Sequence, residues 1–252
     1  MIALWQWPLL FGAGFVAGFV DSIAGGGGLI TLPVLLSCGL PPKEALGTNK
    51  LQASFGSASA AGHYALARAV ALSECRRGFI FTLVGAAAGA LTVQHMDPVF
   101  LRKAIPVLLM LVAVYVLLKP SLGEQDASPR LARPWFDLSF GAALGFYDGF
   151  FGPGTGTFWA MSCVLFLGYN LTRATAYSKV MNFASNLSSL LLFLVGGHVR
   201  FAIGITMGLG QLIGARIGSH MVIRRGTRFI RPVLVGAVLL LTLKLFYDGY
   251  AK

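Results

Sequence analysis

Long apolar runs, separated by short polar connections, make up most of the chain. A helix needs about 20 mostly apolar residues to cross a membrane, and about eight runs are of that order. They cover residues 8–38, 45–66, 78–94 and 99–118 in the first half, and 136–168, 172–196, 201–222 and 229–248 in the second. The pattern predicts an all-α, polytopic integral membrane protein with about eight transmembrane helices.

Glycines interrupt the first apolar run of each half. Four consecutive glycines occupy residues 25–28, and residues 152–156 read GPGTG. Each glycine inside a helix costs roughly 1 kcal/mol relative to alanine, and in a membrane the freed backbone groups need partners. Close helix packing is a common use of single membrane glycines, but it does not need four in a row. We therefore predict that the first helix of each half is broken and that the breaks line a site.

The two breaks belong to a longer internal match between the halves. Asp21 precedes the first break and Asp148 the second, whereas Lys50 and Lys179 follow them at a separation of 129 residues. The same separation relates Gly39 to Gly168 and Gly85 to Gly214. A match of this extent predicts two homologous four-helix repeats, residues 1–118 and 135–252, joined by a polar inter-repeat loop over residues 119–134.

The number of crossings in each half decides how the two repeats are related. Four crossings would make the repeats parallel, whereas an odd number, with a re-entrant half-helix, would make them inverted. The lengths of the apolar segments favour the even count.

Composition and charge agree with a membrane protein. The chain is 56% apolar and 12% charged, with a mean hydropathy of +0.74. Its net charge of +11 comes largely from basic residues at the ends of the apolar runs, such as Arg76-Arg77 and Arg224-Arg225. This placement favours contact with the anionic headgroups of a lipid bilayer and argues against a nucleic-acid partner. The basic residues divide almost evenly between the two sides and leave the sidedness of the termini open.

A helix broken in mid-membrane exposes the N-terminus of its second piece. The free N–H groups and the positive end of the helix dipole at such a terminus attract anions. The backbone groups expected to face the anion are those of Gly26, Gly27 and Gly28 in the first half and of Gly154, Thr155 and Gly156 in the second.

A lysine with trailing amides follows each break. Lys179, Asn182, Asn186 and Ser189 fall on one face of a helix. The shorter counterpart in the first half is Lys50, Ser54 and Ser57, and the amides of Asn49 and Gln52 lie next to Lys50 in sequence. A lysine near the bilayer centre costs roughly 2.5 to 3.5 kcal/mol and indicates function by default. Snorkelling from a helix end is the structural alternative, but it does not account for the amides on the same face. We predict that these side chains bind the substrate.

Asp21 and Asp148 stand at the C-terminal ends of the first half-helices. The dipole is negative there, so an ionised carboxylate is disfavoured. One hypothesis is that they bind a coupling H⁺ or Na⁺ that moves with the substrate. The other is that they accept hydrogen bonds from the freed N–H groups and never titrate, and the sequence leaves both open.

Motifs of enzymes and metal sites are missing from the sequence. It contains no HExxH, no GxSxG and no acidic metal cluster, and Cys38, Cys75 and Cys163 lack the spacing of a metal site or a disulfide framework. We expect neither an enzyme nor a bound cofactor.

The two glycine breaks, the segment Gly47-Thr48-Asn49-Lys50 and the segment from Lys179 to Asn186 resemble the TauE/SafE family of bacterial membrane transporters. The resemblance covers essentially the whole chain. It implies transport across the bacterial inner membrane, with sulfite, sulfoacetate and other organosulfonates as characteristic substrates. The first half has Ala53 where the second has Asn182, so the second half is expected to supply more hydrogen bonds.

These observations predict a secondary transporter that exports a small sulfur-containing anion by alternating access at a site between the two repeats. An anion channel and a membrane subunit or assembly factor without its own substrate are the alternatives. The substrate, the direction of transport, the coupling ion and the oligomeric state, including a homo-oligomer, are left open by the sequence.

Overall fold

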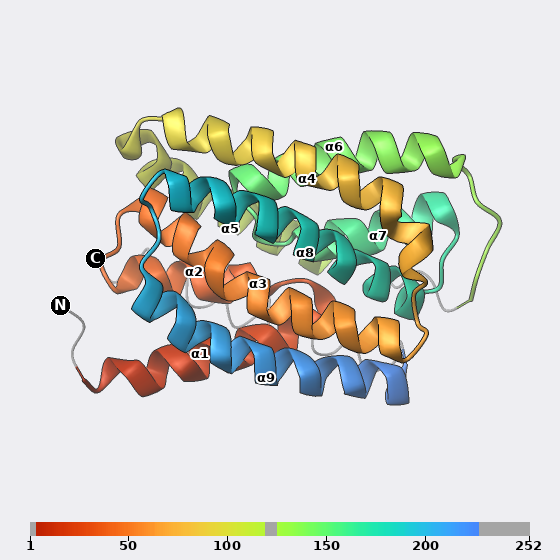
Figure 1. Cartoon of the computed structure of the whole chain (residues 1–252), viewed down its shortest axis with the longest axis horizontal. Helices are drawn as coiled ribbons and strands as arrows, with labels where there is room; N and C mark the ends of the chain where they lie inside the picture. The colour runs from red at the N-terminus through yellow and green to blue at the C-terminus, as the bar shows by residue number, and fades with distance from the viewer. Residues whose placement is uncertain (1–3, 119–124, 227–252) are drawn as a thin grey trace.

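The structure, a computed structural model, describes residues 4–118 and 125–226 (Figure 1). The regular elements in these ranges are all α-helices, which confirms the all-α prediction. They are α1 (Gln6–Ala24), α2 (Gly27–Ser37), α3 (Pro42–Leu66), α4 (Leu72–His95), α5 (Pro98–Leu118), α6 (Arg133–Phe150), α7 (Thr155–Leu167), α8 (Leu171–Val195) and α9 (Phe201–Arg225). The expected segment 229–248 and the first part of the inter-repeat loop, residues 119–124, lie outside the described residues.

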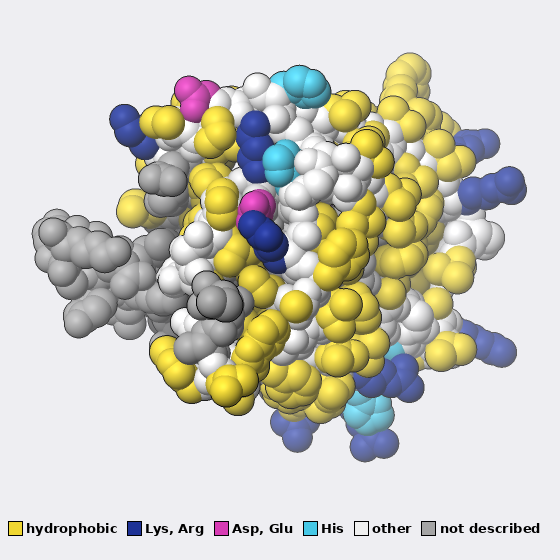
Figure 2. Space-filling view, turned by 60° about the vertical axis from the view of Figure 1, so that its left-hand side comes forward, with side chains coloured by type: hydrophobic (Ala, Val, Ile, Leu, Met, Phe, Trp, Pro, Cys, Tyr) yellow, Lys and Arg dark blue, Asp and Glu magenta, His cyan; other side chains and the backbone are white. Residues whose placement is uncertain are grey.

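Several of these helices have the properties of membrane spans. Among the described residues, α1, α4, α8 and α9 are long and apolar enough to cross a membrane, and α2 and α7 are shorter apolar helices. Large apolar side chains on the outer helices are exposed, among them Val16, Ile80, Val84, Leu209 and Ile213. Figure 2 shows such side chains covering the flank of the molecule, with charged and histidine side chains at the end that faces the viewer and further Lys, Arg and His side chains at the right and lower edges. An apolar flank of this kind fits a lipid environment.

Both predicted helix breaks are present. The first break follows Ala24, where Gly25 adopts the left-handed conformation with φ 83°, and α2 begins two residues later. The second lies between Phe150 and Thr155, where Gly152 and Gly154 have φ values of 102° and 82°. Left-handed φ values favour glycine, so these glycines allow the chain to leave the helical path.

The pieces on either side of each break form a helical hairpin. Helices α1 and α3 both run alongside α9 in the same direction, because Phe11 and Phe15 of α1 lie beside Gly210 and Gly214, and Ser59 and His63 of α3 hydrogen-bond to Leu212 and Ser219. Only α2 and a short connection separate α1 from α3, so α2 must run back along α1 (Figure 1). The same reasoning applies to α6 and α7, since α6 and α8 both run parallel to α4.

The helices matched by the 129-residue separation run in opposite directions. A Cβ atom on Gly47, near the start of α3, would lie 3.0 Å from the Phe193 side chain near the end of α8. The backbone N–H of Arg200, the N-cap residue of α9, donates to the hydroxyl of Thr48 at 3.0 Å. The start of α3 therefore lies beside the end of α8, and the two lysine-bearing helices are antiparallel. This is the relation of inverted halves, and it corrects the parallel arrangement favoured by the apolar segment lengths.

Helices from opposite halves make the closest lateral contacts. Glycines on α1 and α9 face each other's backbones, and those on α4 and α6 do the same. A Cβ atom on Gly149 of α6 would lie 2.0 Å from the carbonyl oxygen of Ala86 on α4. The missing side chains let the backbones touch, as is common in membrane proteins. Helices α3 and α8 pack against each other in the interior.

Candidate functional site

The tips of the two helical hairpins meet in the middle of the molecule. A Cβ atom on Gly25 would lie 2.3 Å from the backbone carbon of Gly156. The hydroxyl of Thr157 donates to the carbonyl oxygen of Ala24 at 2.7 Å. This contact joins the first break to the second and places the start of α7 against the end of α1.

Two crossed ion pairs flank the meeting point of the hairpin tips. Lys50 of α3 contacts Asp148 of α6, with 2.6 Å between Nζ and Oδ1. Lys179 of α8 contacts Asp21 of α1, with 2.9 Å between Nζ and Oδ2. The side chains of Lys50 and Lys179 are only 1% and 0% exposed. Each buried lysine thus neutralises the aspartate of the opposite half.

The two aspartates differ in their remaining partners. Asp148 also accepts a hydrogen bond from Ser185, and Lys50 donates in addition to the backbone carbonyl of Asp148. Asp21 accepts from the backbone N–H of Gly27 at 3.1 Å, at the start of α2. That bond is the one expected for a carboxylate that ties down a helix break.

A small cavity of about 30 Å³ lies beside the ion pairs. Its wall combines carboxylates, amides, a hydroxyl and exposed backbone, contributed by both halves. The lining residues are Asp21, Gly25, Gly28, Asn49, Ala53, Asp148, Gly152, Gly154, Thr155, Gly156, Asn182, Asn186 and Gln211. In this conformation the space has room for about one or two water molecules, and a wall of this composition attracts polar or charged groups.

Nine of the fourteen residues predicted for the site line this cavity: Asp21, Gly28, Asn49, Asp148, Gly154, Thr155, Gly156, Asn182 and Asn186. The other five are Lys50, Lys179, Gln52, Gly26 and Gly27, which lie outside its wall. The lysines are held by the aspartates, and the side-chain amide of Gln52 donates to Asn49 at 2.7 Å. In this conformation the two lysines do not line the cavity, and their positive charges balance those of the aspartates that do.

Gln211 of α9 is the polar lining residue that the sequence analysis missed. It is buried, and its Oε1 atom has no hydrogen-bond partner among the described residues. The Oδ1 atom of Asn182 is likewise without a partner. In the sequence, Gln211 stands out only as a single amide inside an apolar, glycine-rich segment. That pattern indicates a binding site less strongly than a lysine followed by amides on the same helix face does.

Metal ligands do not gather in the part of the chain that the structure describes. There, no group of three or more His, Cys, Asp or Glu side chains is placed to hold a metal ion.

Helix hairpins that meet around a buried polar cavity, inside a bundle with an apolar exterior, are typical of the architecture of a membrane transporter. Comparison with known proteins agrees. The model of the family described as "Sulfite exporter TauE/SafE" matches residues 10–245, and the chain belongs to this family.

Curated relatives carry matching descriptions. A "Probable membrane transporter protein" of Haemophilus influenzae is 46% identical over 240 residues, which cover 95% of this chain and 94% of the relative. The "Probable membrane transporter protein YfcA" of Escherichia coli K12 is 45% identical over 249 residues, with 97% and 93% covered. None of the solved structures matches the chain. The predicted family is confirmed, and the protein is a multi-pass membrane transporter.

Proposed function

We propose that this transporter exports small sulfur-containing oxyanions, such as sulfite, sulfoacetate or other organosulfonates, across the bacterial inner membrane. The observation that carries the proposal is the cavity, in which the N-terminal backbone of α7 and the amides of Asn182 and Asn186 face a space backed by two buried lysines. Helix N-termini, amide N–H groups and ammonium groups all favour an oxyanion. The description of the family, which names sulfite, supports the substrate class.

The ion pairs support a coupled mechanism. An anion that approaches the lysines competes with Asp21 and Asp148, and a carboxylate left without its lysine in a buried site needs a proton or another cation. We propose that H⁺ or Na⁺ binds at an aspartate as the anion binds, and that alternating access moves both. An anion channel would not need a cation that binds together with the anion.

Transport in proteoliposomes tests the proposal. We expect external sulfite or sulfoacetate to exchange with labelled anion inside the vesicles, and the same anions to raise the melting temperature of the purified protein. Taurine, sulfate and carboxylates complete the panel. High flux without exchange would indicate a channel, and the absence of both stabilisation and flux for every anion would contradict the proposed function.

Replacing Asn182 by alanine should weaken the apparent affinity for the anion by about tenfold or more, because a hydrogen bond to a charged group contributes about 1.5 to 3 kcal/mol. The KM for exchange measures the loss. Thr206→Ala is the matched control, since the Thr206 hydroxyl donates only to a carbonyl of its own helix on the exposed face of α9. An unchanged KM in Asn182→Ala would remove this amide from the site.

A further inference from the structure

The two ion pairs are not equivalent. We infer that Lys179 and Asp21 form the exchanging pair, in which the transported anion replaces the Asp21 carboxylate while that carboxylate takes up one proton. Lys50 and Asp148 remain paired throughout. The inference rests on the proposed function and assigns its coupling to one aspartate.

The Lys50–Asp148 pair is saturated. Both carboxylate oxygens of Asp148 are engaged, one by Lys50 and the other by Ser185, and Lys50 donates a second bond to the backbone of the same aspartate. The Asp148 side chain is 5% exposed. Three hydrogen bonds therefore hold this pair in place, two made by Lys50 and one made by Ser185.

The Lys179–Asp21 pair is open by comparison. Asp21 is 17% exposed, and Lys179 makes a single hydrogen bond within the described part of the chain although its ammonium group has three donors. The other carboxylate oxygen of Asp21 accepts from a backbone N–H. Two hydrogen bonds therefore hold this pair, and Lys179 makes only one of them.

The surroundings of Lys179 are prepared for an oxyanion. A Cβ atom on Gly156 would lie 3.0 Å from Lys179 Nζ and 2.8 Å from the side-chain nitrogen of Asn182, so the ammonium and the amide converge on this glycine at the start of α7. Asn182 is 5% exposed and lines the cavity, and its side-chain nitrogen can donate to an oxyanion. At the matching place in the first half the cavity wall is Ala53, which offers no hydrogen bond. The ligand should therefore bind off-centre, toward the second half.

Charge balance at the site couples the binding of the anion to the uptake of a proton. A monovalent anion beside Lys179 replaces one negative charge, and the displaced Asp21 carboxylate becomes neutral by binding one proton. Among the described residues, the ionisable groups that face this site besides Lys179 include Tyr64 of α3, whose hydroxyl donates to the carbonyl of Ser22, and Asp148 with Lys50 across the cavity. Uptake of one proton with each anion makes the apparent affinity rise as the pH falls, by up to about tenfold per pH unit.

Sulfite-dependent stabilisation and exchange, measured between pH 5 and 8 in the full-length protein, test the inference. Because sulfite itself titrates in this range, sulfoacetate serves as the second probe. We expect Asp21→Asn to lose the pH dependence of affinity and Lys179→Ala to lose binding by at least tenfold. The matched variant Asp148→Asn should keep the slope, even if its activity and melting temperature fall.

Conservative variants guard against misfolding. Asp21→Glu retains a titratable carboxylate and should shift the midpoint of the pH profile, whereas Asp148→Glu should not. Equal effects at the two positions, a slope lost only in Asp148→Asn, or dependence on Na⁺ in place of pH would overturn the inference and leave anion transport standing. If the parent protein neither binds nor exchanges any anion, the proposed function itself is wrong.

Discussion

Gly25→Ala is expected to destabilise the protein severely and to abolish transport. The residue has φ 83°, where a Cβ atom costs roughly 1 to 2 kcal/mol. That atom would also lie 2.3 Å from the backbone of Gly156, which belongs to the opposite hairpin and cannot rotate away. Overpacking of this kind adds typically 1 to 3 kcal/mol. We expect the free energy of unfolding to fall by about 2 to 5 kcal/mol, the sum of these ranges.

Two other glycines separate the contributions. Gly39 has φ 81° but nothing within 4 Å of its Cβ position, so Gly39→Ala meets only the conformational cost. Gly12 lies inside α1 with open space around it, so Gly12→Ala meets neither. Thermal unfolding in detergent should rank the variants Gly12, Gly39 and Gly25 in order of increasing loss. If Gly25→Ala and Gly39→Ala have the same melting temperature, the contact between the hairpin tips contributes no stability.

Breaking the Lys50–Asp148 pair should have an effect of similar size. Removing one member of a buried ion pair leaves an uncompensated charge and costs about 3 to 5 kcal/mol. Lys50→Met and Asp148→Leu should each lower the melting temperature strongly, and the double variant should be more stable than the worse single variant. That recovery is the signature of direct coupling.

An exposed ion pair supplies the control for this experiment. Arg200 contacts Glu44 at 2.6 Å, but the Arg200 side chain is 60% exposed. Solvent screens such a pair, so Arg200→Ala should change the melting temperature little. A double variant of Lys50 and Asp148 that loses the sum of the two single effects would contradict coupling between the two residues.

The parts of the site that the sequence predicted are those where rare residue types stand out. Glycine runs, lysines and aspartates are conspicuous in apolar segments, and they led to both hairpin tips and both ion-paired lysines. Which aspartate pairs with which lysine was not predictable. Nothing in the local sequence indicates that Lys50 contacts Asp148 of the other half and not Asp21.

The hairpins were missed for a geometric reason. Residues 8–38 form one apolar run, and its length does not distinguish a tilted, broken span from two helices that fold back on each other. The distinction depends on which helix lies beside α1, and that neighbour, α9, is about 200 residues away in sequence. The glycines of α9 that make this packing possible resemble any small-residue stripe until their partner is known.

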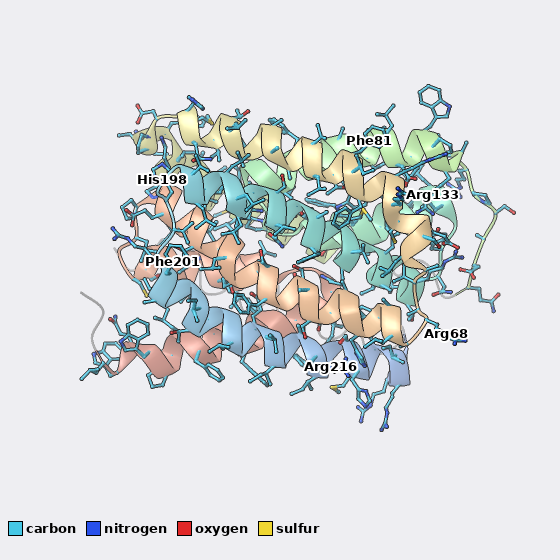
Figure 3. All side chains as sticks on the ribbon, viewed as in Figure 1. Arg68, Phe81, Arg133, His198, Phe201 and Arg216 are labelled. Carbon is cyan, nitrogen blue, oxygen red and sulfur yellow. The ribbon has the colours of Figure 1, made fainter. Side chains whose placement is uncertain are left out.

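The packing of α4 and α9 determines which parts can move as rigid bodies. Helix α9 packs with α1 and α3, and α4 packs with α6 and α8, so each helix lies with the half to which it does not belong in sequence. The chain crosses between these two spatial groups at Arg68, with φ 57°, and 129 residues later at Gly197, with φ 70°. Figure 3 places Arg68 and His198, the neighbour of Gly197, at opposite ends of the molecule. If one group rocks against the other, we expect the described part of the chain to bend at these two left-handed residues.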